Sequence, residues 1–359
     1  MKITFILAYY PWRVDGGCKV VYTYANELAR RGHEVRLVYP SYFRHSVRRF
    51  SQVFRVLDRL YSPPIRWHEI DSRVKSIHVP EPTSEHVPPG DVVIATFWAA
   101  VPYINAYPND RGRRVYLVQA YEDWFGPVAS VDDALKSDVL KVVISKGLYE
   151  KVVSLGVDKS KIAYIPNAVN PADYPLSSPL EERGPCVVLA YNRLWVKGGR
   201  EGLKVLELVK KGYPGAEAIV FSTYRRPMGV PKWVEWHHNP THDELVGIYN
   251  RGAVYLCPSY SEGWHLPAAE AMSCGCALVS TNQFGVGDYA VQMETALLSP
   301  VGDCQGLARN VTALLEDEGL RRRIASAGHK KIGGFGDWGR NISRLERFIS
   351  SDTTNIPGG

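Results

Sequence analysis

Two carboxylates, Glu262 and Glu270, stand eight residues apart in a segment that has the residue types of a ligand site. Gly263 and Pro267 suit a loop that leads into the first turn of a helix. The unpaired N–H groups that begin such a helix attract anions, and we expect those of residues 263–266 to bind a diphosphate. The carboxylates could accept hydrogen bonds from sugar hydroxyls. The alternative is that both only cap or solvate the helix.

Two cations, Arg193 and Lys197, follow the apolar run 187–190 and precede a helical pattern. A departing diphosphate gains negative charge during a transfer reaction. Fixed cations beside it stabilise the transition state more than the ground state. The alternative for two cations in a loop is simple solvation.

The first half of the chain holds two further pairs that follow apolar runs. Gly16 and Gly17 would let the backbone approach a phosphate without an intervening Cβ, or they only form a turn. Glu122 and Asp123 could orient an acceptor hydroxyl or take its proton. An ordinary pair of loop carboxylates is an equal alternative for them.

Short apolar runs alternate with helical patterns along the whole chain. The runs are rich in β-branched residues and apolar on both faces, which predicts parallel strands covered by helices and a doubly wound α/β fold. In open sheets of this kind, ligands bind at the carboxyl ends of the strands, where all the residues above are expected. The predicted strands are 3–8, 35–39, 92–96, 115–119 and 142–145, and then 187–190, 218–221, 254–257 and 277–280.

A proline-rich stretch with few apolar residues separates two halves near residues 166–185. It predicts a first domain over 1–168 and a second over 185–334. A last amphipathic helix, 335–350, is expected to pack back on the first domain. The polar tail 351–359 is expected to be disordered.

The composition argues against a nucleic-acid-binding, a membrane-spanning or a metal-binding protein. The 359 residues are 45% hydrophobic and 22% charged, with a net charge of +6, which suits an anionic small ligand and is too weak to indicate nucleic acid. No apolar run approaches the roughly 18 residues of a membrane span, and the N-terminus lacks a cleavage site, so we expect a cytoplasmic protein. The six cysteines lack metal-ligand spacing, and no metal or cofactor is expected.

The segment from Glu262 to Glu270 resembles the Glu-x7-Glu signature of the retaining glycosyltransferases of family 4, the group 1 transferases. The segment Arg193…Lys197-Gly198 resembles the same family's diphosphate-binding loop. The resemblance implies a GT-B fold, in which two Rossmann-like domains face each other across a cleft. The first domain would bind the acceptor and the second the nucleotide-sugar donor. In the family, the phosphate of the leaving group helps to deprotonate the acceptor.

The resemblance also implies roles for single residues. Glu262 would contact the donor sugar, Glu270 the ribose, and both cations the diphosphate. The implied donor-binding residues are Gly16, Gly17, Arg193, Lys197, His238, Asn239, Glu262, Gly263, Trp264, His265, Leu266 and Glu270. The implied catalytic residues are Arg193, Lys197 and Glu262, together with Glu122 and Asp123 from the residue-based reasoning above.

Two departures qualify the resemblance. Glycine is usual in the family where this chain has His265, and no histidine follows the strand near residue 120. The segment 119–125 looks instead like that of a rhamnosyltransferase-like branch. We therefore expect a metal-independent transferase of polysaccharide biosynthesis, with a UDP-, GDP- or dTDP-linked donor and a glycan, lipid-linked or small acceptor. The alternatives are a nucleotide-sugar epimerase or hydrolase, or a binding protein without activity.

Residues 42–61 carry five arginines beside an apolar stripe. A basic amphipathic helix of this kind could lie on the inner face of a membrane and bring the protein to a lipid-linked acceptor. The alternative is a helix packed on the sheet of its own domain.

Overall fold

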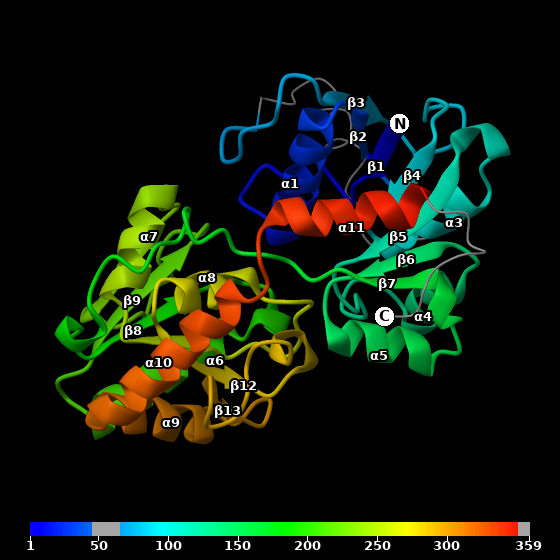
Figure 1. Cartoon of the computed structure of the whole chain (residues 1–359). Helices are drawn as coiled ribbons and strands as arrows, with labels where there is room; N and C mark the ends of the chain where they lie inside the picture. Colours follow the sequence, from blue (N-terminus) through cyan, green and yellow to red (C-terminus); the bar gives the residue numbers. More distant parts are fainter. Residues whose placement is uncertain (45–64, 351–359) are drawn as a thin grey trace. The chain divides into compact units, whose positions relative to one another are not determined.

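The computed structural model describes residues 1–44 and 65–350, and the chain divides into two compact units. Unit 1 comprises Met1–Pro166 with Trp338–Gly359, and unit 2 comprises Asn167–Asp337. Each unit is built on one parallel sheet that is flanked by helices (Figure 1). The expected α/β class is therefore confirmed.

The sheet of unit 1 has the strand order β3-β2-β1-β4-β5-β6-β7, and all of its pairings are parallel. In β1, Ile3 and Phe5 lie on the same face of the sheet, and both are completely buried. Parallel strands need such cover on both faces because their connections are helical. The strands are β1 (Lys2–Ile6), β2 (Glu34–Pro40), β3 (Lys75–Val79), β4 (Val92–Ala95), β5 (Arg113–Val118), β6 (Leu140–Val143) and β7 (Ile162–Tyr164).

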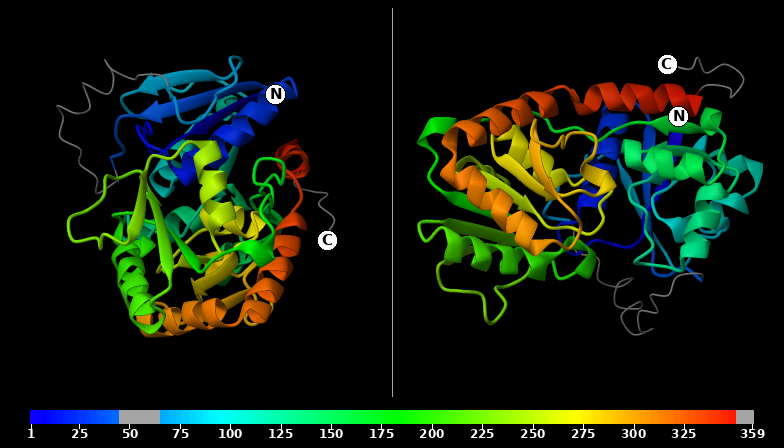
Figure 2. Two further views of the ribbon diagram at one scale, coloured as in Figure 1. Left: turned by 90° about the vertical axis from the view of Figure 1, so that its left-hand side faces the viewer. Right: turned by 90° about the horizontal axis from the view of Figure 1, so that it is seen from below.

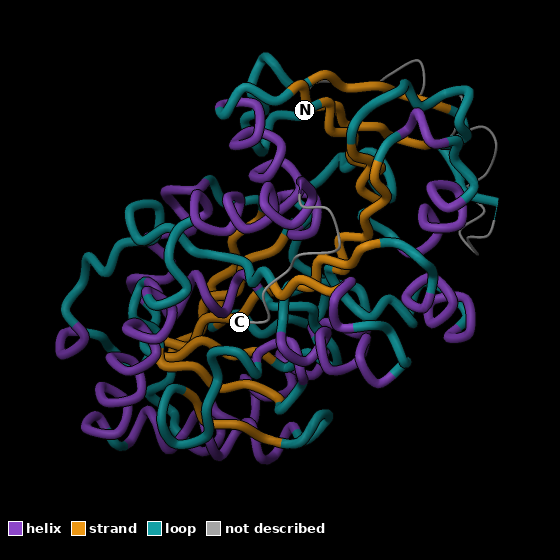
Figure 3. Tube along the Cα trace, turned by 45° about the vertical axis from the view of Figure 1, so that its right-hand side comes forward, coloured by secondary structure: helices purple, strands orange, loops and turns teal. Residues whose placement is uncertain are grey.

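Helices connect these strands and lie on the outside of the sheet (Figure 3). The longest, α1, begins at Gly16, where the Asp15 side chain caps it by accepting a hydrogen bond from the N–H of Cys18 at 2.8 Å. The helices and turns of unit 1 are α1 (Gly16–Arg30), η1 (Trp98–Ala100), α3 (Val101–Asn105), η2 (Asn109–Arg111), α4 (Val128–Lys136), α5 (Lys146–Ser154) and η3 (Lys159–Lys161).

The last helix, α11 (Trp338–Ser350), belongs to unit 1 although it follows the whole of unit 2 in the sequence. Its buried side chains recur at the helical spacing, including Asn341, Ile342 and Leu345. The Asn341 amide donates to the carbonyl of Pro166 at 2.6 Å. Glu346 accepts from Arg31 at 2.5 Å and lies 2.8 Å from His33 Nε2. These contacts attach α11 to the residues just after α1 and to Pro166, the last residue before unit 2.

The sheet of unit 2 has the order β10-β9-β8-β11-β12-β13, again with all strands parallel. Its core joins apolar residues of the central strands to those of α6 and α9, and α9 packs beside α10 (Figure 2). The strands are β8 (Cys186–Ala190), β9 (Glu217–Ser222), β10 (Val234–His238), β11 (Val254–Cys257), β12 (Ala277–Thr281) and β13 (Ala296–Ser299). The helices and turns are η4 (Leu180–Glu182), η5 (Trp195–Lys197), α6 (Gly199–Gly212), α7 (His242–Arg251), α8 (Leu266–Ser273), η6 (Phe284–Val286), α9 (Cys304–Glu316) and α10 (Glu318–Gly333).

Two expectations fall outside the described residues. Most of the basic segment 42–61 lies between residues 45 and 64, and the tail 351–359 follows the last described residue. In the part of the chain that the structure describes, none of the helices has the length and apolar character needed to cross a membrane.

Candidate functional site

Lys197 and Glu262 meet at the carboxyl end of the sheet in unit 2. Lys197 ends η5, which follows β8, and Glu262 lies in the loop after β11. Because β8 and β11 are parallel neighbours, their carboxyl ends lie side by side. Lys197 Nζ is 2.6 Å from Glu262 Oε2. The structure thus brings together a cation and a carboxylate that the sequence places 65 residues apart.

The Glu262 carboxylate is 5% exposed and fully engaged. Its second oxygen, Oε1, accepts from the Ser259 hydroxyl at 2.8 Å. Burial raises the pKa of Glu262, but the charges of Lys197 and His265 and the two hydrogen bonds outweigh burial, and the net pKa is lowered. Glu262 is therefore ionised at neutral pH and already oriented.

A glycine fixes the loop that carries Lys197. Gly198 has φ of +62°, and a Cβ there would lie 2.2 Å from the carbonyl oxygen of Pro258. The N–H of Tyr260 donates to the carbonyl of Val196 at 2.7 Å, which joins this loop to the one that carries Glu262. The close approach of the two loops places Lys197 on Glu262, and only glycine permits it at position 198.

The helix α8 begins at Leu266 beside this ion pair, and the three residues before it, together with Leu266, have free backbone donors. Within residues 1–44 and 65–350, the backbone N–H groups of Gly263, Trp264, His265 and Leu266 donate to no protein acceptor. Four unpaired donors at the positive end of a helix form an anion site. That these groups bind a diphosphate stays a prediction, and the unpaired donors of unit 2 are compatible with it.

His265 and Trp264 turn their side chains into the protein. His265 has φ of +57°, and its Nδ1 accepts from the N–H of Ala268 at 3.2 Å. Its side chain is only 8% exposed, and Nε2 lies 3.9 Å from Glu262 Oε1. Trp264 is 1% exposed and packs on Tyr289. Trp264 is buried so deeply that only its main chain can reach a donor, whereas the His265 side chain is about as buried as that of Glu262.

The remaining predicted residues of unit 2 lie apart from the ion pair. Arg193 is exposed, and its guanidinium lies 4.8 Å from the ring centre of Tyr224. His238 and Asn239 lie at the end of β10, an edge strand of the sheet. The structure shows no contact of these three residues with Lys197 or Glu262 among the residues it describes.

Glu270 is held inside the protein. It is 4% exposed, and its two oxygens accept from Tyr174 OH at 2.9 Å and from Tyr249 OH at 3.2 Å. A ribose contact at Glu270 would require this buried carboxylate to become accessible. No local sequence pattern pointed to Tyr174 or Tyr249, because each contacts Glu270 from a distant part of the chain, and Ser259 was missed although it lies only three residues before Glu262.

A second group of predicted residues gathers at the carboxyl end of the sheet in unit 1. Gly16 and Gly17 begin α1, and Glu122 and Asp123 follow β5. A Cβ at Gly16 would meet no atom within 4 Å, whereas one at Gly17 would lie 3.5 Å from the amide of Gln119. Packing therefore does not require glycine at position 16, and the space above it is open.

Glu122 is a partly buried carboxyl group. Its Oε2 accepts from the backbone N–H of Trp98 at 2.9 Å and from Tyr116 OH at 3.2 Å. Burial raises the pKa of Glu122 to about 8, and the charge of Asp15 adds to this effect. Asp123 is exposed, and burial of part of its carboxyl raises its pKa as well.

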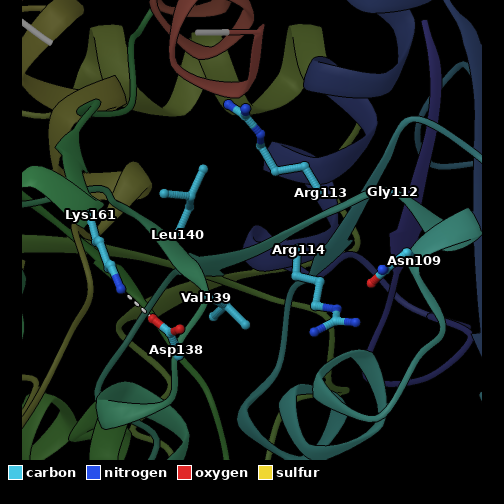
Figure 4. Close-up of a pocket in the computed structure, with 8 residues that line it drawn as sticks. All are labelled: Asn109, Gly112, Arg113, Arg114, Asp138, Val139, Leu140 and Lys161. Atoms are coloured by element: carbon cyan, nitrogen blue, oxygen red, sulfur yellow. Dashed lines mark hydrogen bonds and ion pairs between the residues drawn. The ribbon is translucent and has the colours of Figure 1, made fainter. Parts of the chain in front are cut away.

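A cavity of about 310 Å³ lies elsewhere in unit 1, near the amino ends of β5 and β6 (Figure 4). Its charged groups have partners, because Lys161 pairs with Asp138 and Arg114 donates to the carbonyl of Tyr107. It contains none of the predicted site residues, and ligands of such sheets bind at the opposite, carboxyl end. Among the described residues there is also no group of three or more His, Cys, Asp or Glu arranged for a metal ion.

The chain is similar in sequence to known glycosyltransferases. Residues 221–331 match the family model described as glycosyl transferases group 1. The chain is 25% identical over 232 residues to a glycogen synthase of Mycobacterium tuberculosis, which is 62% of this chain and 54% of that protein. It is 27% identical over 176 residues to a D-inositol 3-phosphate glycosyltransferase of Corynebacterium efficiens, which is 48% of this chain and 41% of that protein. The chain thus spans about half the length of the curated relatives that it matches.

Solved structures resemble nearly the whole chain. A Staphylococcus aureus TarM variant in complex with fondaparinux, alpha-GlcNAc-glycerol and UDP has a TM-score of 0.75 and 10% identity, over 98% of this chain and all of that one. Anabaena Alr3699/HepE in complex with UDP and glucose has a TM-score of 0.71 and 16% identity, over 98% of this chain and 99% of that one. The chain therefore has the GT-B fold, and its residues 221–331 are similar to the group 1 glycosyl transferases.

Proposed function

We propose that this protein is a glycosyltransferase that moves a sugar from a nucleoside-diphosphate donor to a hydroxyl of an acceptor. The observation that carries the proposal is the set of four unpaired N–H groups from Gly263 to Leu266, beside Lys197 and Glu262. The N–H groups and the ammonium supply positive charge where a pyrophosphate would lie. The carboxylate supplies an acceptor for sugar hydroxyls.

The chemistry follows from these charges. As the bond from the anomeric carbon to the β-phosphate oxygen breaks, negative charge grows on the phosphate. Lys197 and the start of α8 are fixed before the reaction, so they stabilise that charge without reorganisation. Protein groups meet the phosphate charge in this proposal, and the sequence offers no Asp-x-Asp motif for a divalent ion.

The donor is proposed to be a UDP-sugar. The neighbouring TarM and HepE structures contain UDP, and a further HepE structure contains UDP-glucose. GDP- and dTDP-sugars, the rhamnosyltransferase-like branch, retention of the anomeric configuration and a cytoplasmic location stay predictions. In this proposal unit 2 binds the donor and unit 1 binds the acceptor, a glycan or lipid-linked sugar.

Two measurements test the proposal. Ligands that bind only the folded state raise its melting temperature, so UDP should raise it more than uridine does, with GDP and dTDP compared alongside. A donor panel is then incubated with and without glycan acceptors. A transferase releases nucleoside diphosphate mainly when an acceptor is present. An epimerase converts the donor and releases little, and a binding protein releases none, and either result would reject the proposal.

A further inference from the structure

The two oxygens of Glu122 have different environments. Both hydrogen bonds that the carboxyl accepts, from the N–H of Trp98 and from Tyr116 OH, go to Oε2. Oε1 accepts none from the described residues, and it is not among the side-chain atoms that are buried without a partner. The carboxyl is therefore held by one oxygen and presents the other toward solvent.

The position of Glu122 suits a reacting group. The three elements around it follow neighbouring strands: Asp15 and Gly16 follow β1, Trp98 follows β4, and Glu122 follows β5. The carboxyl ends of adjacent parallel strands form the usual ligand-binding edge of such a sheet. No atom lies within 4 Å of a Cβ built at Gly16, so the start of α1 is uncovered at this edge.

The charges that face Glu122 favour proton exchange. The groups that act on it are the carboxylate of Asp15 at the start of α1, the hydroxyl of Tyr116 on β5 and the backbone N–H of Trp98 after β4. No cation among the described residues pairs with it. Its pKa of about 8 lies near neutrality, where a general base is most effective.

Asp123 differs from Glu122 in its exposure and its hydrogen bonds, although burial of part of its carboxyl raises its pKa as well. Its side chain is exposed, and backbone N–H groups of Asp123 and Trp124 hydrogen-bond to its carboxylate. Its carboxylate is thus bound to its own loop and largely solvated. The geometry distinguishes two neighbouring carboxylates that the sequence could not.

We propose that Glu122 is the catalytic base of unit 1 and that Oε1 takes the proton of the acceptor hydroxyl. This inference rests on the proposed function. The acceptor O–H bond breaks and its proton passes to Oε1, while the acceptor oxygen bonds to the anomeric carbon. The bond from that carbon to the β-phosphate oxygen breaks, and the nucleoside diphosphate leaves with the electron pair. Glu122 thus takes the role that the family resemblance gives to the leaving phosphate.

The test compares Glu122→Gln with Asp123→Asn as a matched control. The glutamine oxygen can accept both bonds now made to Oε2, so the loop is expected to keep its structure. With the active donor and acceptor, we expect Glu122→Gln to lower kcat at least about 100-fold, with UDP affinity unchanged within about twofold. Asp123→Asn should stay within about threefold of the wild type. Wild-type kcat should rise with pH through a single ionisation, and the residual kcat of Glu122→Gln should not.

A second variant covers the case in which the glutamine protein does not fold. Glu122→Ala should lose kcat similarly, and added formate should restore part of it by supplying a carboxylate in the vacated space. An active wild type with a Glu122→Gln kcat within threefold, or an equal loss of UDP binding, overturns this inference alone. A wild type that transfers no sugar from any donor rejects the proposed function, and this inference with it.

Discussion

Lys197 Nζ and Glu262 Oε2 lie 2.6 Å apart, so the residues predicted to bind the phosphate and the sugar of one donor bind each other. The carboxylate is buried and the ammonium is about one-third exposed, which strengthens their attraction but also makes their desolvation costly. The ammonium has further donor hydrogens and the carboxylate further acceptor positions, so both groups can contact a bound donor while they stay paired. In the proposed transferase the ion pair therefore holds the phosphate contact next to the sugar contact.

Replacing Lys197 by methionine removes the ammonium that we place at the phosphate. We expect UDP affinity and kcat/KM each to fall at least about tenfold, which corresponds to about 1.4 kcal/mol. Calorimetric titration with UDP and initial rates of UDP release measure the two effects. Lys211→Met, an exposed lysine on α6, is the matched control. Equal UDP binding by the Lys197 variant and the wild type would remove Lys197 from the site.

Replacing Glu262 by glutamine separates the two roles of the pair. The variant no longer holds Lys197 by charge, so UDP without a sugar should bind as tightly as to the wild type or up to about tenfold more tightly. Transfer should nevertheless fall at least about tenfold, because the carboxylate that faces the sugar is lost. A Glu262→Gln protein that loses UDP affinity in step with activity would show that Glu262 acts on the nucleotide.

Replacing Gly198 by alanine tests the loop that carries Lys197. The new Cβ would lie 2.2 Å from the Pro258 carbonyl oxygen at a residue with φ of +62°. Gly229→Ala is the control, because Gly229 also has positive φ, of +84°, but no atom within 4 Å of an added Cβ. The control should lose about 1 kcal/mol of unfolding free energy, and Gly198→Ala should lose about 2–4 kcal/mol. Similar losses in both variants would mean that the loops adjust without strain.

The sequence predicted the central strands well and the edge strands poorly. Runs such as 187–190 and 254–257 are apolar on both faces because helices cover β8 and β11 on both sides. The edge strands β3, β7 and β10 escaped prediction because most of their residues are half-buried or exposed, so no apolar run marks them. The edge strand β13 is largely buried and was missed as well, because its apolar run is only three residues long.

The sequence predicted which residues follow the strand ends of unit 2 but not which of them contact each other. The helix-start pattern after Ser261 predicted the unpaired N–H groups, because a proline in the first turn is a local signal. The contact between Lys197 and Glu262 depends on β8 lying next to β11. Neither the sequence around Lys197 nor the sequence around Glu262 indicates this strand order. The burial of Glu270 by Tyr174 and Tyr249 has the same cause. The family usually has glycine where this chain has His265. The resemblance therefore gave no information on the direction of this side chain, which turns inward.

Replacing Glu122 by glutamine should change how stability depends on pH. Burial raises the pKa of Glu122 from an ordinary 4.5 to about 8 in the folded protein. The folded state therefore holds this proton more tightly than the unfolded state does. Its stabilising contribution is complete below about pH 4.5 and is lost as the pH rises to about 8. Above that range Glu122 is ionised in both states, and its contribution stays constant.

The measurement is the free energy of unfolding of the wild type minus that of Glu122→Gln, taken by denaturant titration from pH 4 to pH 9. We expect this difference to fall by about 2–4 kcal/mol over the range, since one unit of pKa is worth about 1.4 kcal/mol and partial exposure weakens the effect. Groups that titrate alike in both proteins cancel in the difference. Asp123→Asn, subtracted in the same way, should give a smaller slope. A flat difference for Glu122→Gln would mean that the carboxyl is solvated as an ordinary glutamate is, and it would then be ionised at neutral pH.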